Sequence, residues 1–284
     1  MSNQNPDELK AKQEQKLAWD DSAEGWKRWW PTFERAAQVV NDRLVELAGA
    51  RAGQRVLDIA TGSGEPALTA ARAVGESGRV VAVDMSPGML ALARERIDSA
   101  GLKNVELIES DAESLLLDDH SFDAVLCRWG LMFMPDHDGV VRGMHRALKP
   151  GGRFATAVWS VADKVPMCGL ARDAIRRITG IVPPPNAPDP IKLADTSILE
   201  RALASAGFRD VTIERLIVTF EFPSADAFAD FRGQIGGTRA TLSKMPAEVA
   251  RQVRDAIVTS AQKYAADGGV VRLSNETICF GARA

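Results

Sequence analysis

The chain has 284 residues, which is enough for one large α/β domain or for a core domain with a small cap. Its hydrophobic content of 45% and charged content of 26% are ordinary for a folded protein and exclude a disordered or collagen-like chain. With 35 Lys and Arg against 38 Asp and Glu, the net charge of −3 lacks the basic character of proteins that grip nucleic acid through its phosphates.

Residues 1–45 are predicted to form a helical N-terminal segment that precedes the sheet. The first residues are polar and lack the apolar stretch of a signal peptide, and no window reaches the roughly 18 apolar residues of a membrane helix. We therefore expect a soluble, cytoplasmic protein with no membrane partner. The three cysteines lie far apart without a CxxC pair, so neither a disulfide framework nor a metal site is expected.

Four of the six tryptophans fall within the first thirty residues, at positions 19, 26, 29 and 30. Their spacings of three, four and seven are typical of an amphipathic helix packed on the domain. The same cluster suits a lid that closes over a crevice, excludes water and stacks on a ligand. Both interpretations stay open, and Trp26, Trp29 and Trp30 are the candidate lid or substrate contacts.

Residues 46–160 alternate short apolar runs with longer helical patterns, as expected for a doubly wound parallel sheet. The runs are continuously apolar, which is typical of strands covered on both faces. Helices are expected from Pro66, from the Ser86–Pro87 cap and from His137. The predicted strands of this core are 55–60, 79–84, 104–110, 122–128 and 153–159.

The rest of the chain is predicted to complete the sheet and to add helices over the substrate side. Residues 161–192 read as a proline-rich insertion, since 181–192 holds five prolines and suits an extended loop. Residues 193–284 supply a capped helix (193–208), a long strand (211–222), a helical cap insertion (224–266) and a final strand (276–282).

Acidic residues follow the first three predicted strands. Asp58 precedes a glycine turn, Asp84 could accept both hydroxyls of a ribose, and Asp111 stands beside a small residue that suits a purine. Glycines at positions 62 and 64 allow close approach of the backbone, and the helix from Pro66 would direct free amides at a ligand. The charge of Asp58 would repel a pyrophosphate but attract an ammonium group, which favours a cofactor with an amino-acid head and an adenosine tail over a dinucleotide.

These stretches resemble the class I S-adenosylmethionine-dependent methyltransferases, in the small-molecule branch of the ubiquinone/menaquinone-biosynthesis type. The matching segments are VLDIATGSGEPAL, VVAVDMSPGMLALARERI, VELIESDAESL, FDAVLCRWGLMFMPD and ALKPGGRF. The resemblance implies a seven-stranded Rossmann-like sheet of order 3-2-1-4-5-7-6 with an antiparallel last strand. It also implies a methyltransferase whose cofactor is S-adenosylmethionine.

The resemblance assigns a part of the cofactor to each strand end. Residues 58–64 would hold the methionine moiety, Asp84 with Met85 the ribose, Asp111 with Ala112 the adenine, and residues 127–129 the region near the sulfonium. Ala60 stands where the family has its first glycine, and its methyl group is expected to be tolerated at negative φ. The expected cofactor contacts are Asp58, Ala60, Thr61, Gly62, Ser63, Gly64, Pro66, Asp84, Met85, Met89, Asp111, Ala112, Cys127, Arg128 and Trp129.

Methyl transfer from a sulfonium needs positioning above all, so catalytic side chains are hard to predict. His137 lies just beyond the fourth strand and Arg128 within its end, and these are the candidates for a base and for a charged contact. The expected substrate is a small aromatic or lipophilic molecule methylated on O, N or C by in-line displacement. Two alternatives stay open, namely a cofactor-binding protein of this fold without methyl transfer, and an NAD(P)-dependent oxidoreductase.

Overall fold

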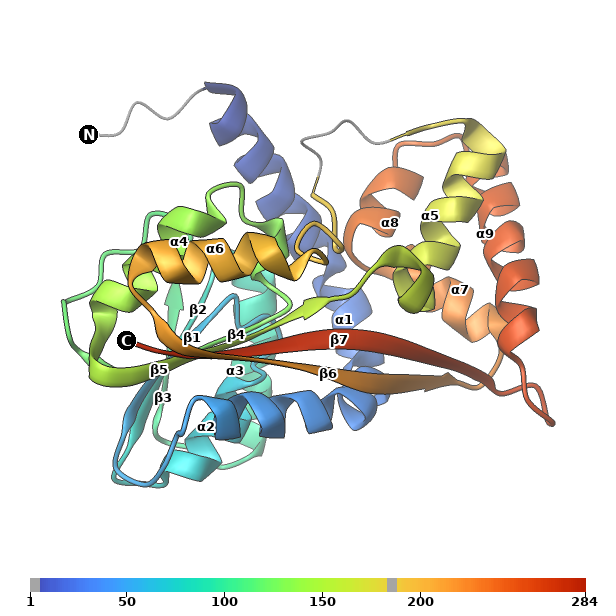
Figure 1. The fold of residues 1–284 in the computed structure, drawn as a ribbon. Coiled ribbons are helices and arrows are strands. Elements are labelled where there is room, and N and C mark those ends of the chain that lie inside the picture. Colours follow the sequence, from blue (N-terminus) through green and yellow to red (C-terminus); the bar gives the residue numbers. More distant parts are fainter. Residues whose placement is uncertain (1–5, 183–187) are drawn as a thin grey trace.

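The structure is a computed structural model that describes residues 6–182 and 188–284 and contains a seven-stranded mixed sheet (Figure 1). The strand order is β3-β2-β1-β4-β5-β7-β6; β1 to β5 are parallel, and β7 runs antiparallel to both of its neighbours. The predicted topology is confirmed. The strands are β1 (Arg55–Ile59), β2 (Arg79–Asp84), β3 (Val105–Glu109), β4 (Phe122–Arg128), β5 (Leu148–Trp159), β6 (Arg209–Phe222) and β7 (Val271–Arg283).

Helices cover both faces of this sheet, which is why its central strands are apolar throughout. The second half of α1 (Pro6–Leu47), with α2 (Ala67–Val74) and α3 (Pro87–Ser99), lies on one face, and α4 (His137–Ala147) and α6 (Thr196–Ala206) lie on the other (Figure 1). Side chains cap three of these helices: Ser86 for α3, Asp136 for α4 and Asp195 for α6. These caps fix where each helix begins relative to the strand end before it.

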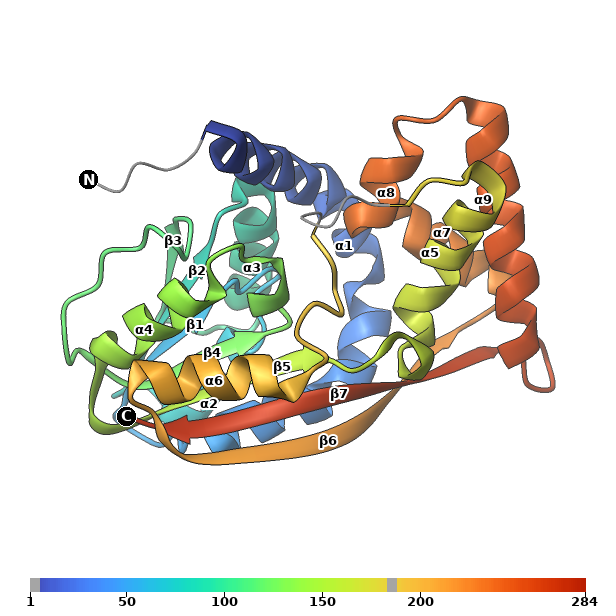
Figure 2. The same ribbon diagram turned by 45° about the horizontal axis from the view of Figure 1, so that its top comes forward.

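The N-terminal segment is a single helix of 42 residues, α1, that bends along its length (Figure 2). Pro31 lies inside it, and an internal proline removes a backbone donor and favours a kink. The first half of α1 crosses above the carboxyl ends of the strands. The second half packs against β5, β6 and β7, with Leu47 against Gly281 and Arg43 paired with Glu214. One helix therefore belongs both to the core and to the edge where ligands bind.

A group of helices extends beyond the parallel strands, carried at the far ends of β6 and β7 (Figure 1). It consists of α5 (Pro166–Thr179), α7 (Ala225–Gln234), α8 (Gly236–Leu242) and α9 (Ala247–Ala261), and we call these four helices the cap. The helix α5 was not predicted, because the proline-rich reading of 161–192 hid its apolar spacing. Residues 183–187 of the predicted extended loop lie outside the described part of the chain. Short 3-10 turns occur at Leu131–Phe133, Ala162–Lys164 and Gln262–Tyr264.

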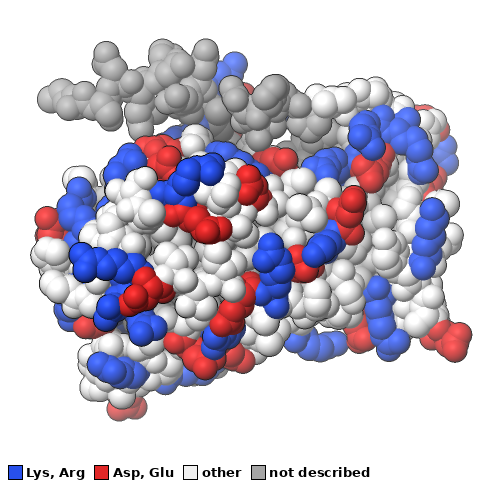
Figure 3. Space-filling model, in the orientation of Figure 1, with Lys and Arg blue, Asp and Glu red and all other residues white. Residues whose placement is uncertain are grey.

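Basic and acidic side chains are interspersed on the face drawn in Figure 3, so the small net charge is spread out there. Ion pairs at the surface include Arg146 with Asp119 and Lys149 with Asp123. Among the described helices, none combines the length and apolarity that crossing a membrane requires.

Candidate functional site

Asp58 is the second-last residue of β1, just before the glycine turn, and it is completely buried. Its Oδ2 accepts a hydrogen bond of 3.1 Å from the amide of Ala67, the first residue of α2. Its Oδ1 and the hydroxyl of neighbouring Thr61 are buried and have no hydrogen-bond partner among the described residues. Burial raises the pKa of Asp58 to about 7, and Glu65 acts in the same direction; the nearby Thr61 hydroxyl, Arg128 and the Ala67 amide act against it. A buried carboxylate oxygen without a donor is a position that a ligand can satisfy.

The glycine turn contains three residues in the left-handed region of backbone space. Gly62 has φ of 55° and Gly64 of 97°, which glycine adopts without strain. Ala60 has φ of 55°, so the expectation of negative φ is wrong and the alanine is strained by its methyl group. Space for that methyl comes from Gly130, where an added Cβ would lie only 2.6 Å from the Cβ of Ala60. The glycine turn therefore depends on two residues together: Ala60, directly after β1, and Gly130, after β4, which leaves room for its methyl group.

Asp84 ends β2 and is oriented by backbone amides. Its Oδ2 accepts from Gly62 at 2.8 Å and its Oδ1 from Ser86 at 3.0 Å. Burial raises its pKa, while these amides lower it. Because a carboxylate has about four acceptor positions, both oxygens keep a lone pair for further donors. Asp20 of α1 lies next to it and accepts from the Ser86 hydroxyl and, at 3.1 Å, from the amide of Gly88.

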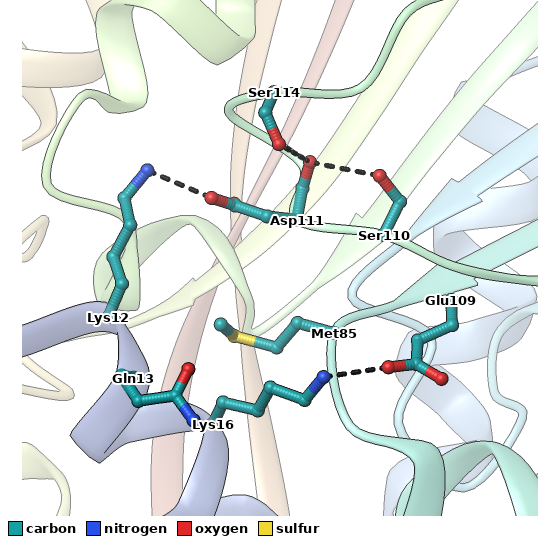
Figure 4. Close-up of a pocket in the computed structure, with 8 residues that line it drawn as sticks. All are labelled: Lys12, Gln13, Lys16, Met85, Glu109, Ser110, Asp111 and Ser114. Atoms are coloured by element: carbon teal, nitrogen blue, oxygen red, sulfur yellow. Dashed lines mark hydrogen bonds and ion pairs between the residues drawn. The ribbon is translucent and has the colours of Figure 1, made fainter. Parts of the chain in front are cut away.

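A hollow of about 370 Å³ opens beside the ends of β2 and β3, under the first turns of α1 (Figure 4). Asp111 projects into it, and Lys12 of α1 lies 2.9 Å from Asp111 Oδ2 and also pairs with Glu113. Lys16, one turn later, lies 2.7 Å from Glu109. The hollow is lined by Lys12, Gln13, Lys16, Met85, Glu109, Ser110, Asp111 and Ser114.

The hollow therefore joins Met85 and Asp111, two of the residues expected to contact a nucleoside. Burial opposes the charge of Lys12, but its hydrogen bonds to Glu113 and Asp111 outweigh burial and raise the pKa of the ammonium group. The first turns of α1 form a roof over the hollow, and ion pairs hold this roof in place. One of them joins Lys12 to Asp111, the carboxylate expected to contact adenine.

The remaining expected contacts lie around the ends of the first three strands. The carbonyl and hydroxyl of Ser63 accept from the Arg96 guanidinium, and Pro66 precedes the first turn of α2. Met89 lies in the first turn of α3, with its Cε 3.5 Å from where a Cβ on Gly62 would stand. Ala112 is half-buried in the turn after β3. The sequence predicted free backbone amides at the start of α2, but the amide of Ala67, its first residue, donates its hydrogen bond to Asp58.

The end of β4 carries a packed charge and an aromatic pair. Arg128 donates to Glu34 through both Nη atoms, at 2.8 and 2.7 Å, and to Asn41 at 2.6 Å, all within the protein. Burial works against ionisation of Glu34, but attraction to Arg128 outweighs it and lowers the pKa of Glu34. Arg128 is therefore an internal ion pair that ties β4 to α1. Burial raises the pKa of the Cys127 thiol to about 12, so it is held as a neutral thiol.

Trp129 follows Arg128 and stacks on Trp159 of β5, with ring centroids 4.2 Å apart. Its indole N–H donates to Thr277 of β7 at 2.9 Å, and Phe33 of α1 meets its ring edge-on at 5.5 Å. These rings form an aromatic wall at the ends of β4 and β5.

His137, the candidate base, lies in another hollow. This second hollow, of about 270 Å³, is lined by residues of α4 and α6 and shares none with the first. His137 Nε2 is 3.5 Å from Asp138, and its Nδ1 is buried with no partner within the described chain. The structure thus brings Asp58, Asp84 and Asp111 to one edge of the sheet and gives His137 different neighbours.

The N-terminal tryptophans pack along α1 in the way their spacing predicts. Trp29 is 7% exposed, contacts Phe222 and Phe231, and donates to Gln234 at 3.0 Å. Trp30 lies under the Arg96 guanidinium, and Trp19 meets Phe133 edge-on. Trp26 packs on Phe33 and Phe231. These contacts join α1 to α3, to the turn after β4 and to the cap.

Lys12, Lys16 and Asp20 were missed as site residues. They recur every four residues, which places them on one face of a helix, and this spacing was available in the sequence. Glu34 and Asn41, seven residues apart, are a similar signal for the partner of Arg128.

Comparison with known proteins adds to this geometry. Residues 35–170 match the model of the ubiE/COQ5 methyltransferase family. The chain is 44% identical over 130 residues to the ubiquinone/menaquinone biosynthesis C-methyltransferase of Ectopseudomonas oleovorans, covering 45% of this chain and 71% of that protein. It is 43% identical over 137 residues to the protein of that name from Pseudomonas putida, covering 48% of this chain and 50% of the relative.

The alignment thus spans about half the length of the Pseudomonas putida relative. Among solved structures, YcgJ from Bacillus subtilis is similar with a TM-score of 0.57 at 20% identity, covering 86% of this chain and 97% of that one. At this identity the likeness concerns the fold.

Proposed function

The chain belongs to the ubiE/COQ5 methyltransferase family, and from this premise we propose that it transfers a methyl group from S-adenosylmethionine to a small organic acceptor. The observation that carries the proposal is the pair of buried, unpartnered oxygens, Asp58 Oδ1 and Thr61 Oγ1, beside the glycine turn. An ammonium group bound there would supply the missing donors and the missing positive charge. The hollow at Met85 and Asp111 accounts for the other end of the same ligand.

The chain's residues fit the cofactor in order along the strand ends. Asp58 and Thr61 would hold the amino-acid end, and Asp84, oriented by two amides, would accept the ribose hydroxyls. Asp111 would accept the amino group of adenine once Lys12 shares or releases it. When bound, S-adenosylmethionine supplies an electrophilic methyl group on a sulfonium.

What the protein contributes to transfer is positioning and exclusion of water. Holding two reactants in line lowers the barrier by roughly 7–11 kcal/mol, which is more than a general base supplies. The roof formed by α1 would close the crevice above the cofactor. The buried Trp129–Trp159 stack makes the ends of β4 and β5 apolar, which favours an aromatic or lipophilic substrate.

Calorimetric titration tests the cofactor assignment. S-adenosylhomocysteine is expected to bind, and NADH is expected not to bind, because the charge of Asp58 opposes a pyrophosphate. Binding of NADH in preference to S-adenosylhomocysteine would support the oxidoreductase alternative. Replacing Asp58 by Asn should weaken S-adenosylhomocysteine binding, while replacing the exposed Asp119 by Asn should leave it unchanged.

A protein that binds the cofactor without methyl transfer is the second candidate. It is favoured by the place of the candidate base, since His137 lies in another hollow, away from Asp58, Asp84 and Asp111. Methyl transfer to a panel of phenols, amines and quinone precursors separates the two. Turnover of one of them supports the enzyme; tight cofactor binding with no turnover across the panel supports the second candidate.

A further inference from the structure

Two arginines of the cap differ from the other arginines around them. The Nε atoms of Arg232 on α7 and Arg239 on α8 are buried and have no hydrogen-bond partner among the described residues. Neither side chain forms a salt bridge within the described chain. In contrast, Arg254 on α9 contacts Asp226 and Asp230 at 3.0 and 2.9 Å.

Among the described residues, no carboxylate pairs with Arg232. Its Nη2 donates to the Thr238 hydroxyl at 2.9 Å, and Cys168 of α5 is the titratable group that acts on it within the described residues. Burial lowers the pKa of the guanidinium. A guanidinium nevertheless stays protonated in proteins, and a buried cation without a partner is costly. An anion from outside the chain is the means of neutralising it.

The helices that carry these two arginines, α7 and α8, both contact α1, which also crosses the cofactor site (Figure 2). The amide of Gly236 donates to Ser22 of α1 at 2.9 Å. Trp26, one turn further along α1, packs on Phe231, and its indole N–H is also buried without a partner in the described structure. Asp20, which contacts the start of α3, is six residues from Trp26, or about 9 Å along the helix.

We propose that Arg232, assisted by Arg239 and Trp26, binds a carboxylate of the methyl acceptor, so that the substrate is an organic acid with an apolar body. This inference rests on the proposed function, because it places the acceptor between the cap and the cofactor site. A guanidinium pairs with a carboxylate through two parallel hydrogen bonds, which an unpartnered Nε can join. The rings of Trp26 and Phe231 would contact the apolar part.

The first test needs no substrate. Replacing Arg232 by Met removes a half-buried charge that has no acidic partner among the described residues, so the melting temperature should stay the same or rise. Replacing the paired, buried Arg128 by Met should lower it, since Glu34 would lose its counter-charge. A melting temperature that falls as far for R232M as for R128M would overturn the proposal, because Arg232 would then be satisfied within the fold.

The second test measures recognition with matched probes, each at saturating S-adenosylhomocysteine. We would compare benzoate, 2-naphthoate and decanoate with their neutral amides by titration calorimetry. At least one acid is expected to bind about tenfold or more tightly than its amide, the usual effect of a hydrogen bond to a charged group. In R232M this preference should disappear, while the exposed control R254M keeps it.

The outcomes separate the two hypotheses. Equal binding of acid and amide for all three pairs, or a preference that survives in R232M, would overturn the carboxylate site. Tighter binding of inorganic phosphate than of any carboxylate would overturn the assignment of an organic acid. Failure to bind S-adenosylhomocysteine, with an acid preference that depends on Arg232 in its absence, would overturn the proposed function and leave the anion site standing.

Discussion

Lys12 in the first turns of α1 donates a hydrogen bond of 2.9 Å to Asp111, which follows β3 ninety-nine residues later in the chain. The contact joins the roof of the site to the carboxylate that we assign to adenine. Lys16 and Glu109 repeat it one helical turn away. Entry of a nucleoside therefore requires these charges to separate or to rearrange.

Removing the ion pairs of Lys12 and Lys16 should speed the exchange of cofactor. In a Lys12→Met, Lys16→Met double variant, association and dissociation of S-adenosylhomocysteine should both become several-fold faster, because opening α1 no longer breaks ion pairs. Stopped-flow tryptophan fluorescence would measure both rates, and high salt should reproduce part of the effect in the wild type. The control is Lys149→Met, which removes an ion pair at the amino end of β5, the end of the strand opposite to the site. Unchanged rates in the double variant would show that these pairs do not control access.

Ionisation of Asp58 should make cofactor binding depend on pH. With a folded pKa of about 7, the carboxyl is increasingly protonated below neutrality, and the neutral form attracts an ammonium group less. Affinity for S-adenosylhomocysteine should fall by up to about tenfold per pH unit below pH 7 and level off above it. Calorimetry between pH 5.5 and 7.5 would measure this. Asp58→Asn should bind weakly at every pH, and an unchanged slope in that variant would assign the titration to another group.

The same shift has the opposite sign for stability. An unfolded Asp releases its proton near pH 4, whereas folded Asp58 keeps its proton until about pH 7. The native state thus binds more protons in this window, and the contribution of Asp58 to the free energy of unfolding falls as pH rises from 4 to 7. Asp58→Asn should flatten that part of the curve in urea denaturation. A variant with the wild-type pH profile would contradict this.

The buried pair of Arg128 and Glu34 should stabilise the junction of β4 with α1. Arg128→Met alone would leave a buried carboxylate uncompensated, which typically costs about 3–5 kcal/mol. Glu34→Gln combined with Arg128→Met removes both charges and should recover most of this loss. Urea denaturation of the two single variants and the double variant measures their coupling. Additive losses would show that the pair is not coupled.

Ala60 and Gly130 should behave as a coupled pair. Ala60→Gly relieves an alanine at φ of 55° and should raise stability by about 1 kcal/mol. Gly130→Ala places a methyl 2.6 Å from the Ala60 Cβ and 2.9 Å from the Cys127 sulfur, so it should destabilise the protein. In the double variant the contact with Ala60 is gone and part of the loss should return. Thermal unfolding of the four proteins checks this, and equal loss in both backgrounds would contradict it.

The family, the sheet topology and the strand ends could be predicted from the sequence, because apolar runs, caps and acidic residues at strand ends are local patterns. Confirmation covers the family and the order of the strands. The positive φ of Ala60 could not be predicted, since it depends on the space that Gly130 leaves across the turn. The ion pair of Arg128 with Glu34 could not be predicted either, because it depends on how α1 crosses β4.

The roles of the site residues remain predictions. The sequence placed three carboxylates at one sheet edge but did not indicate that Lys12 would hold one of them. The helix α5 was missed because nearby prolines outweighed its own apolar spacing. For Lys12 and Asp111 the missing information is a contact between segments far apart in the chain, which no local pattern contains.

The last residue of β6 and the first of β7 face each other in register, Phe222 opposite Val271. The chain therefore departs for α7, α8 and α9 and returns at a single rung of an otherwise continuous hairpin. Another sequence of different length could be spliced between these two positions without altering the register of β6 with β7, provided that it replaced the contacts of α7, α8 and α9 with α1 and α5. Acceptor choice could then diversify among relatives while the nucleoside half of the molecule stays constant.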